Sequence, residues 1–235
     1  MISEQHFSSS FTSIWHEIIP LADTYWRREN LRVTREGTPI KNTAPINLRG
    51  FLNELAFESF TRLKMSNRPA SKDIIISIAN EALDNVADYI FRITGDNQSV
   101  ALTLDDSCEE EVFRLARNLI QCFPDGTDII FRPRFSGCGL VSACEGDLIY
   151  KGCLYEIKAG DRGFRVSDVK QLLIYSSLAF SKGDLTFSKV GLFNPRNGYH
   201  WERTLDQLCV ELSGMRESDV LSSLSVSMTQ LAISR

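Results

Sequence analysis

In the first half of the chain, hydrophobic residues recur at spacings of three and four, a pattern that predicts amphipathic helices. In the first of them, the apolar positions from Phe11 to Trp26 fall close to one helical face. In the second, a stripe runs from Leu52 to Leu63. The pattern predicts single continuous helices over residues 7–29, 48–64, 71–93 and 105–123.

The pattern changes after about residue 126, where short apolar runs alternate with Gly, Pro and Asn. Such runs are typical of strands. Helices are expected again over residues 168–180 and 202–214, and the last twenty residues carry a weak helical pattern. The second half therefore predicts a strand-rich α/β core over about 126–201, with strands in DIIFRPRF (128–135), GLVSACEGDLIY (139–150), CLYEIKAG (153–160) and KVGLFNP (189–195).

Composition places the chain among ordinary globular proteins, since 43% of its 235 residues are hydrophobic and 24% are charged. No run approaches the roughly 18 apolar residues of a membrane-spanning helix. The N-terminus lacks the basic region and apolar run of a secretory signal. We expect a cytoplasmic protein without a membrane partner.

Six cysteines are present, and no two of them form a CxxC pair. Structural zinc sites usually draw their ligands from closely spaced pairs. Free cysteine otherwise behaves as a small buried hydrophobe. We expect buried free thiols and no iron–sulfur cluster.

The segment CEGDLIYKGCLYEIKAG (144–160) carries the candidate chemistry. Lys151-Gly152 suits a two-residue hairpin turn between two strands. That register places Asp147 opposite Glu156 on one side of the hairpin, where two carboxylates repel each other unless a cation lies between them. Lys158 projects from the same face, because side chains alternate along a strand. The competing interpretation is a solvent-facing hairpin with an ordinary Glu–Lys pair, and a longer turn would shift the register.

The arrangement of GDLIY followed by LYEIK resembles the central signature of the PD-(D/E)xK nuclease superfamily. Gln171 and Tyr175 in DVKQLLIY resemble the QxxxY motif on the next helix of its RecB-like members. The resemblance implies an α/β fold with a restriction-endonuclease-like core, in which a central mixed sheet is flanked by helices, and a mainly helical N-terminal region. The implied organisation is an N-terminal extension (1–47), a nuclease core (48–201) with a helical insertion at about 70–123, and a C-terminal helical tail (202–235).

The same resemblance implies a metal site. Asp147, Glu156 and the main-chain carbonyl of Ile157 would hold one or two Mg²⁺ or Mn²⁺ ions, which prefer oxygen ligands. The superfamily also uses a glutamate from an upstream helix. Glu54 is the first choice for this extra ligand and Glu58 the second; the less favoured alternative is that the pair forms an exposed acidic face.

The remaining roles concern the substrate. Lys158 would orient the attacking water and stabilise charge on the phosphate. Gln171 would position the nucleotide or the lysine, and Tyr175 would contact the nucleic-acid backbone or pack behind it. Arg132 and Arg134 would bind flanking phosphates, or they are ordinary surface charge near Pro133; the sequence favours neither.

His200 in NGYHWER is more simply explained as a structural residue than as a general base, since no serine or cysteine nucleophile accompanies it. The net charge of −4 offers no overall basic surface. Basic residues cluster only locally, in RRENLRVTR (27–35) and FRPRF (131–135), and the first cluster is more simply an ordinary solvated surface.

Taken with the resemblance, the sequence predicts a metal-dependent DNA endonuclease of anti-phage defence or DNA processing. The resemblance suggests a protein partner such as an ATPase or helicase, and it allows a homodimer. The alternative is a non-catalytic nucleic-acid-binding or scaffold subunit of a defence complex. A weaker third hypothesis is a metal-dependent phosphohydrolase that acts on small nucleotides.

Overall fold

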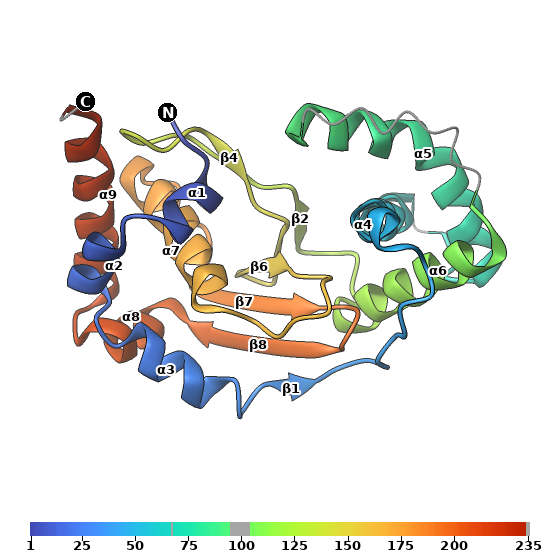
Figure 1. The fold of residues 1–235 in the computed structure, drawn as a ribbon, viewed down its shortest axis with the longest axis horizontal. Coiled ribbons are helices and arrows are strands. Elements are labelled where there is room, and N and C mark those ends of the chain that lie inside the picture. The colour runs from blue at the N-terminus through green and yellow to red at the C-terminus, as the bar shows by residue number, and fades with distance from the viewer. Residues whose placement is uncertain (67, 95–103, 234–235) are drawn as a thin grey trace.

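The computed structural model describes residues 1–66, 68–94 and 104–233, and it has an α/β architecture built on a six-stranded mixed sheet (Figure 1). The strand order is β1-β8-β7-β6-β5-β2; β6 and β7 are parallel, and all other neighbours are antiparallel. A separate two-stranded ribbon pairs β3 with β4. The strands are β1 (Thr34–Arg35), β2 (Ile129–Phe131), β3 (Arg134–Phe135), β4 (Cys144–Glu145), β5 (Leu148–Tyr150), β6 (Cys153–Ile157), β7 (Lys189–Asn194) and β8 (Tyr199–Thr204).

Helices cover both faces of the sheet, with α4 and α6 on one face and α7 on the other (Figure 1). Alternation along β6 explains the two layers: Leu154 belongs to the core that contains α7, whereas Tyr155 packs with Phe57 of α4 and Phe123 after α6. The helices are α1 (Glu4–Ser9), α2 (Thr12–Ile18), α3 (Ala22–Glu29), the 3₁₀ helix η1 (Ile46–Leu48), α4 (Arg49–Ser66), α5 (Lys72–Thr94), α6 (Asp106–Cys122), α7 (Val166–Lys182), α8 (Leu205–Ser213) and α9 (Glu217–Ile233).

The N-terminal segment and the region of the expected helical insertion have different surroundings. Helices α1–α3 contribute Phe7, Trp15 and Trp26 to the core that also contains α7 and α9, and β1 pairs with β8. Helices α5 and α6 instead pack on α4 around a core of their own. Residues 95–103 of the expected insertion lie outside the described residues.

The single helix predicted over residues 7–29 is wrong, because the segment forms α1, α2 and α3. At the first junction, Phe11 adopts a left-handed conformation with φ of 56°, which interrupts the helix. Pro20 explains the second junction, since a proline disfavours helical geometry in the residue before it; Ile19 has φ −130° and ψ 64°. The apolar face was nevertheless predicted correctly, because Trp15, Ile19 and Trp26 are all buried.

The predictions of helices at 48–64, 71–93, 105–123 and 168–180 are confirmed by α4, α5, α6 and α7. The helix predicted over 202–214 begins only at Leu205, because residues 199–204 form β8 and pair with β7 along its whole length. Neither β8 nor β1 was predicted from the sequence. The weak helical pattern of the last twenty residues corresponds to α9.

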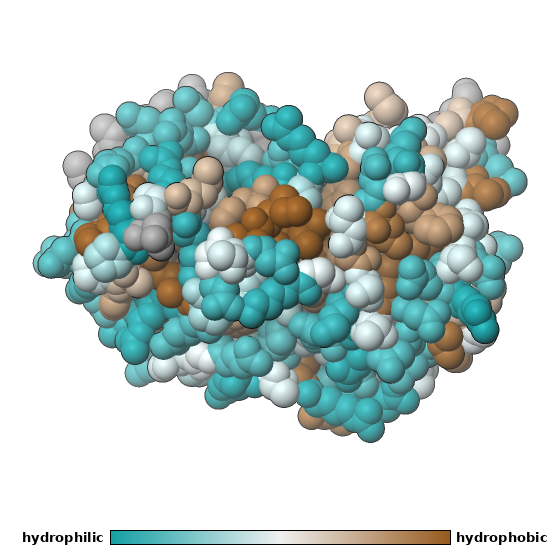
Figure 2. Space-filling model, turned by 180° about the vertical axis from the view of Figure 1, so that it is seen from behind, coloured by the Kyte–Doolittle hydropathy of each residue, from teal (hydrophilic) through white to brown (hydrophobic). Residues whose placement is uncertain are grey.

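Figure 2 shows the face opposite to that of Figure 1. Apolar side chains gather around the middle of this face and are bordered by hydrophilic ones (Figure 2). Within the described ranges, no helix combines the length and hydrophobicity needed to cross a membrane.

Gly139 supports a close approach between the loop before β4 and helix α9. Its φ is +55°, and an added Cβ would lie 2.2 Å from the carbonyl oxygen of Met228. We expect Gly139→Ala to lower the free energy of unfolding by about 3–4 kcal/mol, because positive φ and a backbone clash both oppose the methyl group. Gly183→Ala is the matched control: its φ is +73° with open space around it, so about 1 kcal/mol is expected. Urea denaturation measures the free energy of unfolding of both variants. Equal losses in the two variants would show that the backbone clash at Gly139 does not contribute.

Candidate functional site

The β5–β6 hairpin has the turn and register that the sequence predicts. Lys151 and Gly152 have φ of 48° and 69°, as a type I′ two-residue turn requires. Tyr150 pairs with Cys153, and Leu148 pairs with Tyr155. Asp147 directly precedes β5 and Glu156 follows Tyr155, so the two carboxylates approach each other at the open end of the hairpin.

The two carboxylates differ in their partners. Asp147 Oδ2 accepts a hydrogen bond of 2.6 Å from the main-chain amide of Ile157. Glu156 is only 6% exposed, and its Oε1 accepts a bond of 2.9 Å from Lys158 Nζ. Its Oε2 is buried and has no hydrogen-bond partner among the described residues. A buried charged oxygen without a partner is costly, so this atom is a candidate ligand for a cation.

Lys158 connects the carboxylates to helix α7. Its Nζ donates to Glu156 Oε1 and, at 2.8 Å, to Gln171 Oε1. The amide nitrogen of Gln171 donates to the hydroxyl of Tyr175 at 2.7 Å and to Glu4 Oε1 at 3.4 Å. The side chains of the ExK and QxxxY motifs thus form one hydrogen-bonded chain, which fixes the position of the lysine ammonium group.

The electrostatics of the site follow from burial. Burial raises the pKa of Asp147 well above its ordinary value, and the charge of Glu156 raises it further. Burial also raises the pKa of Glu156, although Lys158 opposes this. Burial alone would lower the pKa of Lys158, but the neighbouring Glu156 and Asp147 more than offset it, so the pKa of this lysine is raised. Lys158 is therefore a fixed positive charge rather than a base.

The site opens into a cavity of about 820 Å³, which lies between the hairpin and helices α1, α4, α5 and α7. An adjoining cavity of about 680 Å³ extends along α4 and α5. The polar and ionisable side chains that line the first cavity include those of Glu4, Glu54, Tyr89, Asp147, Glu156 and Gln171.

Glu54 and Arg132, expected to bind metal and phosphate respectively, form an ion pair with each other. Arg132 also lies 3.9 Å from Glu58 and stacks over the ring of Tyr89, 4.2 Å from its centroid. Arg134 is 85% exposed and pairs with Glu145 at 3.1 Å.

The other expected residues are placed as follows. Glu58 bonds Arg62 at 2.8 Å and lines the second cavity rather than the first. The side chain of Ile157 packs into the core on the opposite face of the sheet from α7, as the alternation of side chains along β6 requires.

Glu4 is the main cavity residue that the sequence analysis did not identify. It lies in the first turn of α1, which is capped by Ser3 and packs against α7. The cap could be recognised from sequence, but no spacing rule connects residue 4 with Gln171, 167 positions later. Tyr89 and Arg92 of α5 also line the cavity without a sequence signal.

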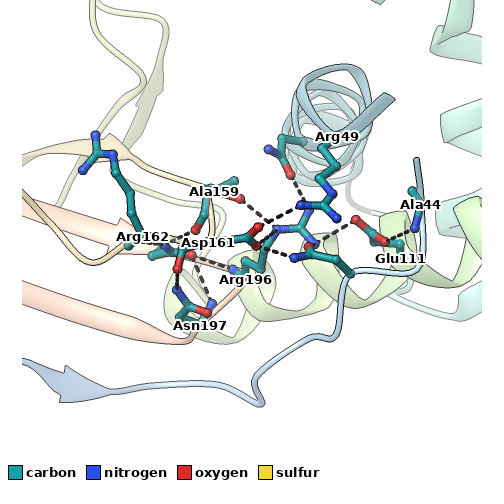
Figure 3. Close-up of polar contacts among 12 residues, drawn as sticks. Ala44, Arg49, Glu111, Ala159, Asp161, Arg162, Arg196 and Asn197 are labelled. Carbon is teal, nitrogen blue, oxygen red and sulfur yellow. Dashed lines mark hydrogen bonds and ion pairs between the residues drawn. The ribbon is translucent and has the colours of Figure 1, made fainter. Parts of the chain in front are cut away.

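A buried arginine fixes the segment that follows Lys158 (Figure 3). Arg196 is 1% exposed, and its guanidinium donates to the carbonyl of Ala159 at 2.9 Å and to the side chain of Asn53 in α4 at 2.8 Å. It also pairs with buried Glu111 of α6 at 2.8 Å. The network ties the end of β6 to both helices on one face of the sheet.

The donor set suits a divalent cation, since it offers a buried oxygen without a partner beside a second carboxylate and a cavity. Mg²⁺ and Mn²⁺ prefer such oxygen ligands. No protein-family model matches the chain, and no curated protein matches it.

The raised carboxyl pKa values predict how stability depends on pH. A group with a raised pKa in the folded state binds protons more tightly when folded, so its stabilisation is lost as pH rises through that pKa. Without divalent cations, we expect the free energy of unfolding to fall as pH rises above the ordinary carboxyl pKa of about 4 and on through the raised pKa values of Asp147 and Glu156. Asp147→Asn should flatten this slope, because it removes one of the two raised groups.

Urea denaturation in the presence of a chelator measures this effect. Asp23→Asn, an exposed change outside the cavity, is the control and should retain the wild-type slope. Equal slopes in wild type and Asp147→Asn would contradict the prediction.

Proposed function

We propose that this protein is a Mg²⁺- or Mn²⁺-dependent nuclease that hydrolyses phosphodiester bonds within DNA, built on a restriction-endonuclease-like core. The observation that carries the proposal is the buried, unpartnered Oε2 of Glu156 beside Asp147 and Lys158 at the wall of a large cavity. The resemblance of these residues to the PD-(D/E)xK signature, and of Gln171 and Tyr175 to the QxxxY motif, supports it. We further propose a role in anti-phage defence or DNA processing.

Each residue has a role in this proposal. Asp147 and Glu156, with the carbonyl of Ile157, would hold the cation, which supplies Lewis acidity to the scissile phosphate. Lys158 stabilises negative charge that develops on the phosphate, and its raised pKa keeps it protonated. Gln171 holds the lysine in place.

Glu54 Oε1 is paired with Arg132, so a metal ion that takes both oxygens of this carboxylate would exchange that ion pair. The same exchange would release Arg132 for a phosphate group. The proposal therefore links metal binding by Glu54 to phosphate binding by Arg132.

The direct test is cleavage of supercoiled plasmid and linear duplex DNA with Mg²⁺, with Mn²⁺ and with a chelator. We expect divalent-metal-dependent nicking of the supercoiled form, which identifies internal cutting. Single-stranded DNA, RNA and mononucleotides are parallel substrates. Hydrolysis of mononucleotides alone would favour a small-nucleotide phosphohydrolase and contradict the nuclease.

One observation favours the second candidate, a non-catalytic nucleic-acid-binding or scaffold subunit. The cavity wall is rich in carboxylates, and Arg132 is already neutralised by Glu54, so the described residues that line the cavity offer few unpaired cations to a polyanion. DNA binding without cleavage under every metal condition, both by the isolated chain and by the chain purified together with its partner, would support this candidate and contradict the enzyme. The acidic cavity also favours dependence on a protein partner, such as an ATPase or helicase. Full activity of the isolated chain would contradict that dependence.

A further inference from the structure

A second group of metal-binding side chains lies on the other face of the sheet from Glu156. Glu36 follows β1, Cys122 ends α6, and His200 lies in β8. Each of these three residues offers one potential ligand atom, and the three atoms all lie within 4.8 Å of one another. Since Tyr155, the neighbour of His200, points to the opposite face of β6 from Glu156, this group is separate from the cavity.

The donor types and distances fit a small, borderline-soft cation. Glu36 Oε1 lies 3.2 Å from His200 Nδ1, and Glu36 Oε2 lies 3.9 Å from Cys122 Sγ. Donors of a tetrahedral zinc site are about 3.3–3.8 Å apart, as its bond lengths of 2.0–2.3 Å require. Only small rotations of these side chains would therefore bring all three donors onto one ion.

The hydrogen bonds around His200 orient a lone pair toward the group. Tyr155 has one hydroxyl proton and donates it to Glu202. Its oxygen can therefore only accept from His200 Nε2, which lies 3.2 Å away. In neutral His200 the lone pair is then on Nδ1 and faces the carboxylate of Glu36, an arrangement that a cation between them would stabilise. A hydrogen bond from the second ring nitrogen is also the usual support of a histidine ligand.

Cys122 supplies the donor that distinguishes this group from the carboxylate cavity. Without a metal ion its side chain is a protonated thiol at neutral pH, since the ordinary pKa of cysteine is about 8.5. A divalent cation would displace this proton on binding. The resulting thiolate and the carboxylate of Glu36 together would balance the two positive charges.

We propose that Glu36, Cys122 and His200 bind one zinc-class divalent cation, with water completing a tetrahedral shell on the side of half-exposed Glu36. The site joins the segment after β1, the end of α6 and strand β8, so it would hold helix α6 against one edge of the sheet. It is distinct from the oxygen-ligand site proposed for Mg²⁺, because one of its donors is a thiolate.

The test is titration of the metal-free, reduced full-length chain with Co²⁺, whose thiolate complexes show a charge-transfer absorption, followed by competition with Zn²⁺. We expect one tight equivalent with this absorption, one proton released from the thiol, and a higher melting temperature with Zn²⁺. Cys122→Ser should remove the absorption, and both Cys122→Ser and His200→Gln should weaken Zn²⁺ binding by at least about 100-fold. Tyr155→Phe should weaken it about 10-fold, as expected for a residue that only orients the ligand.

Matched controls separate this site from other thiols and carboxylates. Cys144 lines the carboxylate cavity, so Cys144→Ser should retain the absorption, as should His16→Gln and Glu156→Gln. Unchanged Zn²⁺ affinity in Cys122→Ser, or an absorption lost only in Cys144→Ser, would overturn the proposal. Circular dichroism of each metal-free variant checks its fold. Because no nucleic acid is used, a negative result leaves the proposed nuclease function unaffected.

Discussion

Glu156→Gln is expected to reduce Mg²⁺-dependent DNA cleavage by at least about 1000-fold. The substitution keeps the size of the side chain and can still accept a hydrogen bond from Lys158, but it removes the negative charge that a divalent cation needs. Electrostatic stabilisation by a metal ion contributes several kcal/mol to catalysis, and each 1.4 kcal/mol corresponds to a tenfold change in rate. Initial rates of plasmid nicking measure the effect.

The matched control for this variant is Glu17→Gln, which changes an exposed glutamate on α2 and should retain the wild-type rate. Metal binding, followed by calorimetry, should weaken together with cleavage in Glu156→Gln. Because burial raises the pKa of Glu156 more than the neighbouring Lys158 lowers it, the charged carboxylate is unfavourable without a divalent cation, and this variant should be no less stable than wild type in a chelator. Cleavage that survives the substitution would show that the active site lies elsewhere.

Arg196→Met is expected to lower the free energy of unfolding by about 3–5 kcal/mol, because it leaves the buried carboxylate of Glu111 without its cation. The Oε2 atom of Glu111 keeps its bonds to the amides of Thr43 and Ala44, but Oε1 loses the ion pair. The carbonyl of Ala159 loses its donor as well. Chemical denaturation measures the loss.

Two further variants identify the cause of this loss. Arg216→Met changes an exposed arginine and should alter stability by less than about 0.5 kcal/mol. The double variant Arg196→Met/Glu111→Leu should recover part of the loss, since replacing both members of a buried ion pair by apolar residues is often tolerated. If the double variant is as unstable as the sum of its single variants, the unpaired charge is not the cause.

Local features of the candidate site could be predicted from sequence. The Lys151-Gly152 turn fixed the pairing of Tyr150 with Cys153, and the two-residue period of a strand then placed Lys158 on the same side as Glu156. Both rules act over a few residues, so no distant contact had to be known. The helices α4 to α7 were predictable for the same reason, because their hydrophobic stripes extend over several turns.

Contacts between distant segments could not be predicted. The pairing of Arg132 with Glu54 depends on how α4 packs beside β2, and the bond between Gln171 and Glu4 depends on how α1 packs on α7. Strand β8 was missed because its fully paired position beside β7 is decided by the sheet rather than by its own polar residues, Glu202 and Arg203.

The sequence by itself determined an α/β chain with a carboxylate hairpin, and it determined which face of that hairpin carries Glu156 and Lys158, because turn geometry and side-chain periodicity are local properties. Only the tertiary structure decided that Glu156 Oε2 is buried without a partner and that Glu4 enters the cavity. It also decided that Cys122 meets Glu36 and His200. These contacts depend on how the helices pack against the two faces of the sheet, and no single segment of the sequence specifies that packing.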